Sequence, residues 1–182
     1  MMAHTLYLIR HATPDWDRKD IPYHLPPGPE LTVLGQAEAR ALGAYLCETG
    51  VQRLYASPLE RTLRTACIAG EAGGAQVIVD ERLSEWQPGE SLDEVSRRIL
   101  PAVDEILAEA AGRPVGLVTH GGPVEAILLG LGMALPKDAR RYDRGNLLPP
   151  AGAWRADYHA EQGGWRFGLV FIPQAALHQL GS

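Results

Sequence analysis

Short apolar runs alternate along the chain with longer segments in which apolar residues recur every three or four positions. The short runs have the length of strands, and the longer segments have the period of amphipathic helices. Strands are predicted at residues 5–9, 51–56, 75–80 and 114–120, the last of which is apolar enough to be buried on both faces. Because such alternation produces right-handed crossovers between parallel strands, we expect an α/β fold, a three-layer α/β/α sandwich with a mostly parallel central sheet.

The first predicted helix covers residues 32–49 and ends at Gly50, since glycine favours the conformation that follows a helix. Its predicted buried face consists of Leu34, Ala37, Ala41, Ala44 and Tyr45. A short helix is expected at residues 124–131. Residues 153–159 and 164–172 are interpreted as a hairpin at a sheet edge, and edge strands of this kind could support a homodimer.

Two more helices are predicted from capping boxes, in which a serine caps the helix and a glutamate three residues later bonds back to it. Ser57 and Glu60 form the first box, and Ser91 and Glu94 form the second. Pro101 lies inside the helix that follows the second box. Proline lacks a backbone N–H and crowds the preceding turn, so it either kinks this helix or splits it in two.

The composition is that of a globular protein: of the 182 residues, 46% are hydrophobic and 21% are charged. This length suits one hydrophobic core, and no repeat or linker interrupts the pattern, so we predict a single domain over residues 1–182. The formal net charge of -5 argues against general nucleic-acid binding. No apolar run is long enough to span a membrane.

The expected location is the cytoplasm. The first residues, "MMAHTLYLIRH", lack the basic segment and the long apolar core of a signal peptide. Cys47 and Cys67 are too few for a disulfide framework and lie among helix-forming residues. We therefore expect them to be buried thiols of a reducing compartment.

Polar residues with catalytic chemistry follow the carboxyl ends of the predicted strands. Arg10 and His11 follow the first strand, and Arg61 lies one turn into the helix after the second. Glu85 follows the third strand and His120 follows the fourth. Because ligands of open α/β sheets bind in the crevice outside these strand ends, we expect the five side chains to share one site.

The residue types in this site suit phosphoryl transfer. Two guanidinium groups match the oxygens of phosphate or carboxylate, and the glycines that begin at Gly121 could add backbone N–H donors. A neutral imidazole is a nucleophile available at pH 7, and a second imidazole could stabilise charge on a transferring phosphoryl group. A glutamate could protonate the leaving alcohol.

Six segments, in order along the chain, resemble the motifs of the histidine phosphatase superfamily, whose members are also called phosphoglycerate mutase-like. They are "LIRHATPDW", "LTVLGQAEARAL", "YASPLERTLRTA", "ERLSEW", "PGESLDEV" and "VTHGGPV". The resemblance covers most of the chain and implies a phosphohistidine on His11, with Glu85 as the proton donor. It also implies a phosphate pocket made by Arg10, Arg61 and His120, and a reaction that needs no metal and no organic cofactor.

The segment after His11 departs from the usual motif of the superfamily. Thr13 stands where glutamate is common, and Asp17 where asparagine often contacts the phosphate. A second carboxylate would repel a phosphate dianion, so we expect Asp17 to point elsewhere. The loop "RKDIPYHLPPGPE" should lie near the site, which makes Tyr23 and His24 candidates for substrate contact.

A second departure favours hydrolysis. In many mutases of the superfamily a long insertion after the catalytic glutamate covers the site, whereas here "EWQPGES" joins Glu85 almost directly to the next capping motif. With so small a lid, water should reach the phosphohistidine. We therefore predict a phosphomonoesterase acting on a small phosphorylated metabolite or a phosphoprotein, and the natural substrate stays open.

Several alternatives stay open on sequence alone. Glu90 lies close enough to serve as the proton donor instead. Ser57 is interpreted as a helix cap, and Arg140, Arg141 and Arg144 as solvated cations, one of which could meet an acidic substrate. The competing functions are a cofactor-dependent phosphoglycerate mutase, a non-catalytic phospholigand-binding module and a metal-dependent hydrolase. The arginines and the lack of metal-ligand spacing oppose the last of these.

Overall fold

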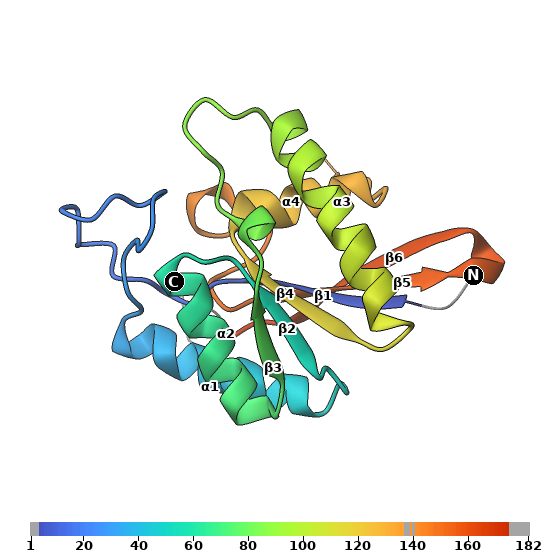
Figure 1. Ribbon diagram of the computed structural model, residues 1–182, viewed down its shortest axis with the longest axis horizontal. Coiled ribbons are helices and arrows are strands. Elements are labelled where there is room, and N and C mark those ends of the chain that lie inside the picture. The colour runs from blue at the N-terminus through green and yellow to red at the C-terminus, as the bar shows by residue number, and fades with distance from the viewer. Residues whose placement is uncertain (1–3, 137–138, 140, 175–182) are drawn as a thin grey trace.

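The computed structural model describes residues 4–136, 139 and 141–174. Within this part of the chain, a six-stranded sheet has the strand order β3-β2-β4-β1-β5-β6 (Figure 1). The parallel strands are β1 (His4–Arg10), β2 (Arg53–Ala56), β3 (Gln76–Val79) and β4 (Val115–Thr119). The antiparallel strands are β5 (Ala153–His159) and β6 (Gly164–Phe171), which form the predicted edge hairpin beside β1.

Two pairs of helices cover the two faces of this sheet (Figure 1). One pair is α1 (Val33–Cys47) and α2 (Glu60–Gly73), and the other is α3 (Leu92–Ala110) and α4 (Gly121–Gly130). Three short 3₁₀ turns, η1 (Glu81–Leu83), η2 (Asp143–Gly145) and η3 (Ala160–Gln162), lie in the connections. The three-layer α/β/α sandwich with a mostly parallel sheet is thus confirmed.

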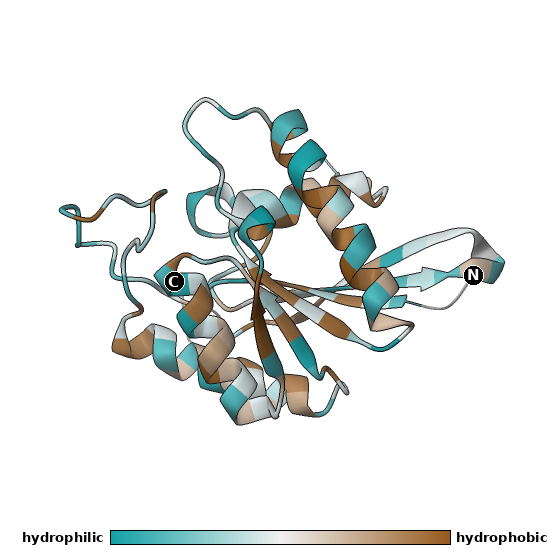
Figure 2. Ribbon diagram, in the orientation of Figure 1, coloured by the Kyte–Doolittle hydropathy of each residue, from teal (hydrophilic) through white to brown (hydrophobic). Residues whose placement is uncertain are grey.

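The central strand β1 feeds a hydrophobic core on each side of the sheet. Leu6 and Leu8 belong to the core beneath α3 and α4, whereas Tyr7 and Ile9 belong to the core beneath α1 and α2. In Figure 2 hydrophobic residues are concentrated in the central strands of the sheet and recur along α3. Burying a leucine or isoleucine side chain stabilises a fold by about 1.5–3 kcal/mol, so these two cores fix the position of the β1 carboxyl end.

The buried face of α1 differs from the predicted one. It consists of Gly35, Glu38, Ala39, Leu42, Gly43 and Leu46. Of the predicted face, Leu34, Ala37, Ala41 and Ala44 are exposed and Tyr45 is half-buried. The reason is the close approach of α2, because a Cβ on Gly43 would lie 2.5 Å from the Ala69 carbonyl oxygen. A face built partly from glycine escapes a search for bulky apolar residues.

The second capping box is confirmed, one of the two alternatives for Pro101 is excluded, and one predicted helix start is wrong. The Glu94 amide donates to Ser91 Oγ, and the Glu94 carboxylate accepts from the Ser91 amide at 2.8 Å. Pro101 lies inside a single α3, so the helix is not split in two. α4 begins at Gly121 rather than at residue 124, because His120 already stands in the N-cap position with an extended backbone.

The structure also bears on the expected absence of a membrane span and on the two cysteines. Among the described residues, no helix has the length and the apolar character needed to cross a membrane. The prediction of buried thiols is wrong, since Cys47 is exposed and Cys67 is half-buried, and both are free. Their place on helix surfaces explains this, because a cysteine among helix formers can face either way.

Candidate active site

The backbone brings three strand ends to one edge of the sheet. The His11 amide donates to the Thr119 carbonyl at 2.9 Å, and the Ser57 amide donates to the Val118 carbonyl at 3.1 Å. Arg10 is paired with Thr119 in the β1–β4 register. The segments after β1, β2 and β4 are thereby held side by side before any side chain is considered.

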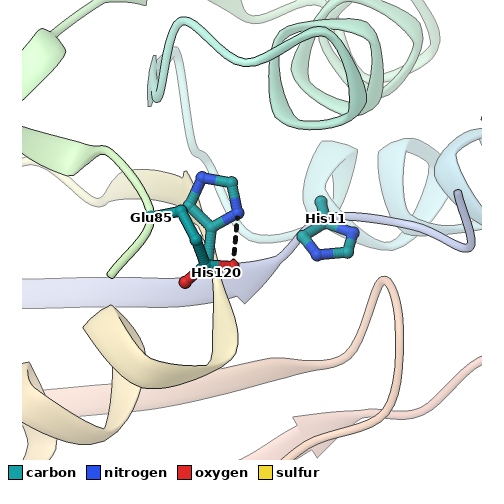
Figure 3. A group of neighbouring side chains, drawn as sticks. All are labelled: His11, Glu85 and His120. Carbon is teal, nitrogen blue, oxygen red and sulfur yellow. Dashed lines mark ion pairs between the residues drawn. The ribbon is translucent and has the colours of Figure 1, made fainter. Parts of the chain in front are cut away.

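The structure gathers all five predicted catalytic and phosphate-binding side chains at this edge. They are buried although each is polar: Arg10, His11, Arg61, Glu85 and His120. The two imidazole rings have centroids 5.4 Å apart, and His120 lies within ion-pair distance of Glu85 (Figure 3). Buried charges are expensive unless they are paired, so this concentration indicates a built site rather than a chance cluster.

The ring of His11 is held so that one nitrogen is available for attack. Nδ1 lies 2.8 Å from the Ala12 carbonyl oxygen, which can only accept, so Nδ1 carries the proton and Nε2 carries the lone pair. The Tyr23 hydroxyl lies 3.3 Å from Nε2 and can donate to it. Burial, followed by the charges of Arg61 and Arg10, holds the pKa of His11 well below its ordinary value. The imidazole is therefore neutral, which is the form in which a histidine can act as a nucleophile.

His120 makes contacts with both of its ring nitrogens. Nε2 lies 2.9 Å from Ser57 Oγ, and Nδ1 lies 3.2 Å from Arg61 Nη2 and 3.4 Å from Glu85 Oε2. Burial and then the charge of Arg61 hold the pKa of His120 well below its ordinary value. The ring is a neutral donor to Ser57 that can take up a proton beside a carboxylate.

Ser57 does not cap α2 as the sequence predicted. The helix begins at Glu60, its N-cap residue is Leu59, and no side chain caps it. Ser57 lies before this turn and has its hydroxyl on His120 instead. The sequence signal for a cap and the signal for a strand-end site residue coincide at this serine, and only the tertiary contact distinguishes them.

Both buried arginines keep an N–H that has no acceptor. Among the described residues, Arg10 Nε and Arg61 Nε are buried and make no hydrogen bond. The remaining nitrogens of Arg61 are engaged, with Nη1 donating to the Tyr23 carbonyl at 2.9 Å and Nη2 donating to Glu85 at 3.3 Å. Unsatisfied buried donors are rare and costly, so two of them on guanidinium groups whose charges both act on His11 indicate that an anion belongs there.

Sequence reasoning missed the partner of Arg10. Asp143, in the η2 turn, receives two hydrogen bonds from the Arg10 guanidinium, at 2.7 and 2.8 Å. Arg10 is 2% exposed and Asp143 is 37% exposed, so the pair joins a buried cation to a carboxylate at the surface. No sequence signal marked this contact, because it joins residues 133 positions apart through a turn with no recognisable motif.

Glu85 and Glu90 have different surroundings. Glu85 is 8% exposed and lies against Arg61 and His120. Glu90 forms an ion pair with Arg98 at 2.9 Å, and this contact lowers the pKa of Glu90. Both carboxylates meet an arginine, so position distinguishes them. A carboxylate oxygen of Glu85 lies within 4.8 Å of a ring nitrogen of both site histidines, whereas Glu90 is turned to Arg98. This favours Glu85 as the proton donor.

The remaining residues that the sequence singled out lie in different surroundings. Tyr23 lies in the site, whereas Asp17 and His24 are exposed. Thr13 turns to Glu38, donating to its carboxylate from both the amide and the hydroxyl. Gly121 opens α4 and packs against Asn146, so tightly that a Cβ would collide with the Asn146 amide group. Arg140 lies outside the described residues.

A metal ion could be considered from the ligand set alone. His11, Glu85 and His120 each present one ligand atom, and these atoms lie within 4.8 Å of one another. Arg61 Nη2, however, lies 3.3 Å from Glu85 Oε2 and already occupies the space beside it. A metal cation would be repelled by the two guanidinium groups that the site already holds, so the donor set fits an anion better than a cation.

Comparison with known proteins identifies the family. A model of the histidine phosphatase superfamily (branch 1) matches residues 6–90 and 86–162. The matches cover most of the chain, so the chain belongs to this superfamily.

Individual relatives carry the names of phosphatases and mutases. The Hydrogenobacter thermophilus protein "Putative phosphoserine phosphatase 2" is 38% identical over 85 residues, 47% of this chain and 41% of that protein. The Klebsiella pneumoniae protein "Probable phosphoglycerate mutase GpmB" is 30% identical over 162 residues, 69% of this chain and 75% of that one. The structure of a mycobacterial glucosyl-3-phosphoglycerate phosphatase with VO3 has a TM-score of 0.72 at 25% identity, covering 94% of this chain and 100% of that chain. These relatives place the chain among hydrolases or mutases of phosphoryl groups.

Proposed function

We propose that the protein is a metal-independent phosphomonoesterase that works through a phosphohistidine on His11. The observation that carries this proposal is the His11 ring itself, with Nδ1 fixed on the Ala12 carbonyl and Nε2 unprotonated. Beside it stand two buried guanidinium groups, each with an unbonded Nε–H. A neutral nucleophile next to unfilled anion donors is the arrangement that attack on a phosphate dianion requires.

In the first step, the Nε2 lone pair of His11 attacks phosphorus and the bond from phosphorus to the leaving oxygen breaks. Arg10 and Arg61 stabilise the charge on the non-bridging oxygens. Glu85, in its protonated form, gives its proton to the leaving oxygen, so the alcohol departs neutral. His120, next to Glu85, donates to the phosphoryl group through the Nε2–H that meets Ser57 Oγ in the free protein.

In the second step, water attacks the phosphohistidine and the N–P bond breaks. Glu85 is now ionised and takes a proton from the attacking water, which restores its protonated form. The products are inorganic phosphate and neutral His11, so the cycle closes without a cofactor. The same carboxyl group thus serves as acid and then as base, as microscopic reversibility requires.

Hydrolysis is preferred over mutase activity because little of the chain covers the site. Only residues 84–91 separate η1 from α3, and no further element is inserted there. The likeness to a phosphatase structure over nearly its whole length supports the same choice. The relative named as a phosphoglycerate mutase keeps that activity as the second candidate, and an assay for phosphoglycerate isomerisation decides between them.

The proposal is tested by trapping the intermediate. The protein is quenched in acid and in alkali during turnover of a ³²P-labelled phosphomonoester. We expect protein-bound label that is lost in acid and kept in alkali, as for a phosphoramidate. His11→Ala should lose this label and at least about 10⁴-fold in kcat, because no other group can form the covalent intermediate.

The matched control is His159→Ala, which removes an exposed histidine at the end of β5. It should keep both the label and the rate, and the wild-type rate should persist in excess chelator. An active His11→Ala protein, or activity abolished by the chelator, would contradict the proposal.

A further inference from the structure

A hollow of about 400 Å³ lies beside the candidate site, between the loop of residues 15–29 and the η2 turn. Its walls include Trp16 and Tyr23 from the loop and Arg144 from the turn. The catalytic steps described above use none of its charged residues. Tyr23 belongs to both places, because it lines the hollow and its hydroxyl lies 3.3 Å from His11 Nε2. The hollow therefore adjoins the nucleophile.

A continuous stack of side chains connects the site to the rim of the hollow. The Arg61 guanidinium carbon lies 3.9 Å from the Tyr23 ring centroid, and the Tyr23 ring stacks on Trp16 at 5.4 Å. The Arg144 guanidinium carbon lies 4.2 Å from the Trp16 centroid at the outer end. Cation–π contacts of this kind hold a guanidinium in place while leaving its N–H groups available.

The direction of attack points from His11 towards this hollow. In phosphoryl transfer the nucleophile, phosphorus and leaving oxygen lie roughly in line. The lone pair of His11 Nε2 now meets the Tyr23 hydroxyl, so phosphorus must take up the position near that hydroxyl. The leaving group then extends further along the same line, on the side where Tyr23 forms a wall of the hollow.

The hollow carries a positive balance in a protein of net charge -5. Arg18 is neutralised by Asp20 at 2.9 Å. Lys19 and Arg144 remain, and no described carboxylate forms an ion pair with either of them. Asp15 also lines the hollow and contributes one negative charge, so the two cations leave a positive balance.

Arg144 also has an unusual backbone. Its φ of 53° and ψ of 24° place it in the left-handed region, which residues with a Cβ adopt rarely. Such conformations persist where the surrounding structure imposes them and are concentrated at ligand sites. Here the turn presents Arg144 to Trp16 while the preceding residue, Asp143, is held by Arg10.

We propose that this hollow holds the leaving group of the substrate, and that Arg144 is a specificity-determining residue for phosphomonoesters whose alcohol carries a second anionic group. The inference rests on the proposed phosphatase function. Trp16 lies between the nucleophile and the cation, since its ring centroid is 6.3 Å from that of His11 and 4.2 Å from the Arg144 guanidinium carbon. A carboxylate or a second phosphate on a leaving group that extends past Trp16 would meet the guanidinium fork.

The test compares two synthetic esters of equal size, 4-carboxyphenyl phosphate and 4-carbamoylphenyl phosphate, which differ in the charge at the far end of the ring. We expect the wild-type protein to have the higher kcat/KM for the carboxylate. In Arg144→Gln the ratio of the two kcat/KM values should fall about fivefold, chiefly through KM, as loss of one exposed ion pair implies. The wild-type ratio should also shrink as salt is raised.

The control is Arg155→Gln, which removes an exposed arginine of β5 outside the hollow and should keep the wild-type ratio. A wild-type ratio near one, or an Arg144→Gln ratio equal to that of wild type, overturns the role of Arg144 while the phosphatase function stands. Failure of the wild-type protein to hydrolyse either ester overturns the phosphatase function, and the inference with it. Melting temperatures of the variants identify any loss that comes from misfolding.

Discussion

Single residues in this protein owe their chemistry to burial. His11 and His120 would each carry a partial charge at neutral pH in water, but burial holds the pKa of both well below the ordinary value of 6.5. Arg61 is also buried, and its charge is balanced in part by Glu85 at 3.3 Å. The site thus combines neutral imidazoles with paired ions, an arrangement that favours nucleophilic attack on an anion.

At this scale we predict that Glu85→Gln separates proton donation from attack. With an alkyl phosphate, whose leaving group needs a proton, kcat should fall about 10²- to 10³-fold. With 4-nitrophenyl phosphate, whose leaving group departs as an anion, the loss should be at least tenfold smaller. Steady-state kinetics with both substrates measure the difference.

Glu90→Gln is the matched control, since Glu90 is paired with Arg98 rather than placed beside His120. It should change either rate by less than about threefold. An equal loss for the two variants, or for the two substrates in Glu85→Gln, would remove Glu85 from the role of general acid.

Among the structural elements, the η2 turn contacts the site although the sequence did not predict it there. Through Asp143 it binds Arg10 with two hydrogen bonds, and through Arg144 it contacts Trp16 in the neighbouring loop. An arriving phosphate must therefore share Arg10 with a carboxylate that carries the same sign of charge. Under the proposed function, we expect the turn to weaken the binding of phosphate, and so of the inorganic product.

We predict that Asp143→Asn strengthens product inhibition. Removal of one negative charge beside the pocket should lower the inhibition constant of inorganic phosphate about fivefold, and the melting temperature should fall because the buried Arg10 loses the carboxylate that balances its charge. Inhibition kinetics and thermal unfolding with and without phosphate measure both effects. Added phosphate should raise the melting temperature more in this variant than in wild type.

Asp157→Asn serves as the control, because Asp157 pairs with Arg155 and Thr5 on β5 and β1. Its phosphate inhibition should match that of wild type. Weaker inhibition in Asp143→Asn would show instead that Asp143 holds Arg10 in the position that phosphate needs.

For the whole molecule, the two neutral imidazoles make stability depend on pH. In the unfolded chain each histidine takes up a proton near pH 6.5, whereas in the folded protein the lowered pKa keeps it neutral to more acidic pH. The unfolded state therefore binds more protons below pH 6.5, and stability is lost as the pH falls. Above pH 6.5 both states hold the histidines neutral and the free energy of unfolding does not depend on them. Below pH 6.5 it decreases until the pH reaches the lowered pKa of the folded state.

We predict a decrease in the free energy of unfolding of about 1.4 kcal/mol per histidine for each pH unit below 6.5 within that window. Urea unfolding at pH 7, 6 and 5 measures the slope. His11→Asn should remove one such contribution and flatten the slope, whereas His159→Asn, at an exposed position, should not. Identical slopes for wild type and His11→Asn would contradict the assignment.

The architecture was predictable because its signals are local. Strand length, helical period and the Ser91–Glu94 box each depend on neighbouring residues, and the α/β/α sandwich follows from their order. The buried face of α1 was not predictable, since the helix buries Gly43 together with Leu42 and Leu46 and leaves Leu34 exposed. Which face of a helix is buried depends on how closely its partner approaches, and that distance has no local signature.

The sequence by itself determined the family, the class of chemistry and the residues that gather at the strand ends. It did so because parallel strands bring every carboxyl end to one edge, so that position along the chain translates into position in space. The tertiary structure decided what each group contacts: Ser57 on His120, Asp143 on Arg10, and Arg144 over Trp16. These contacts join distant segments whose side chains are brought together only by packing, and packing is a property of the folded chain as a whole.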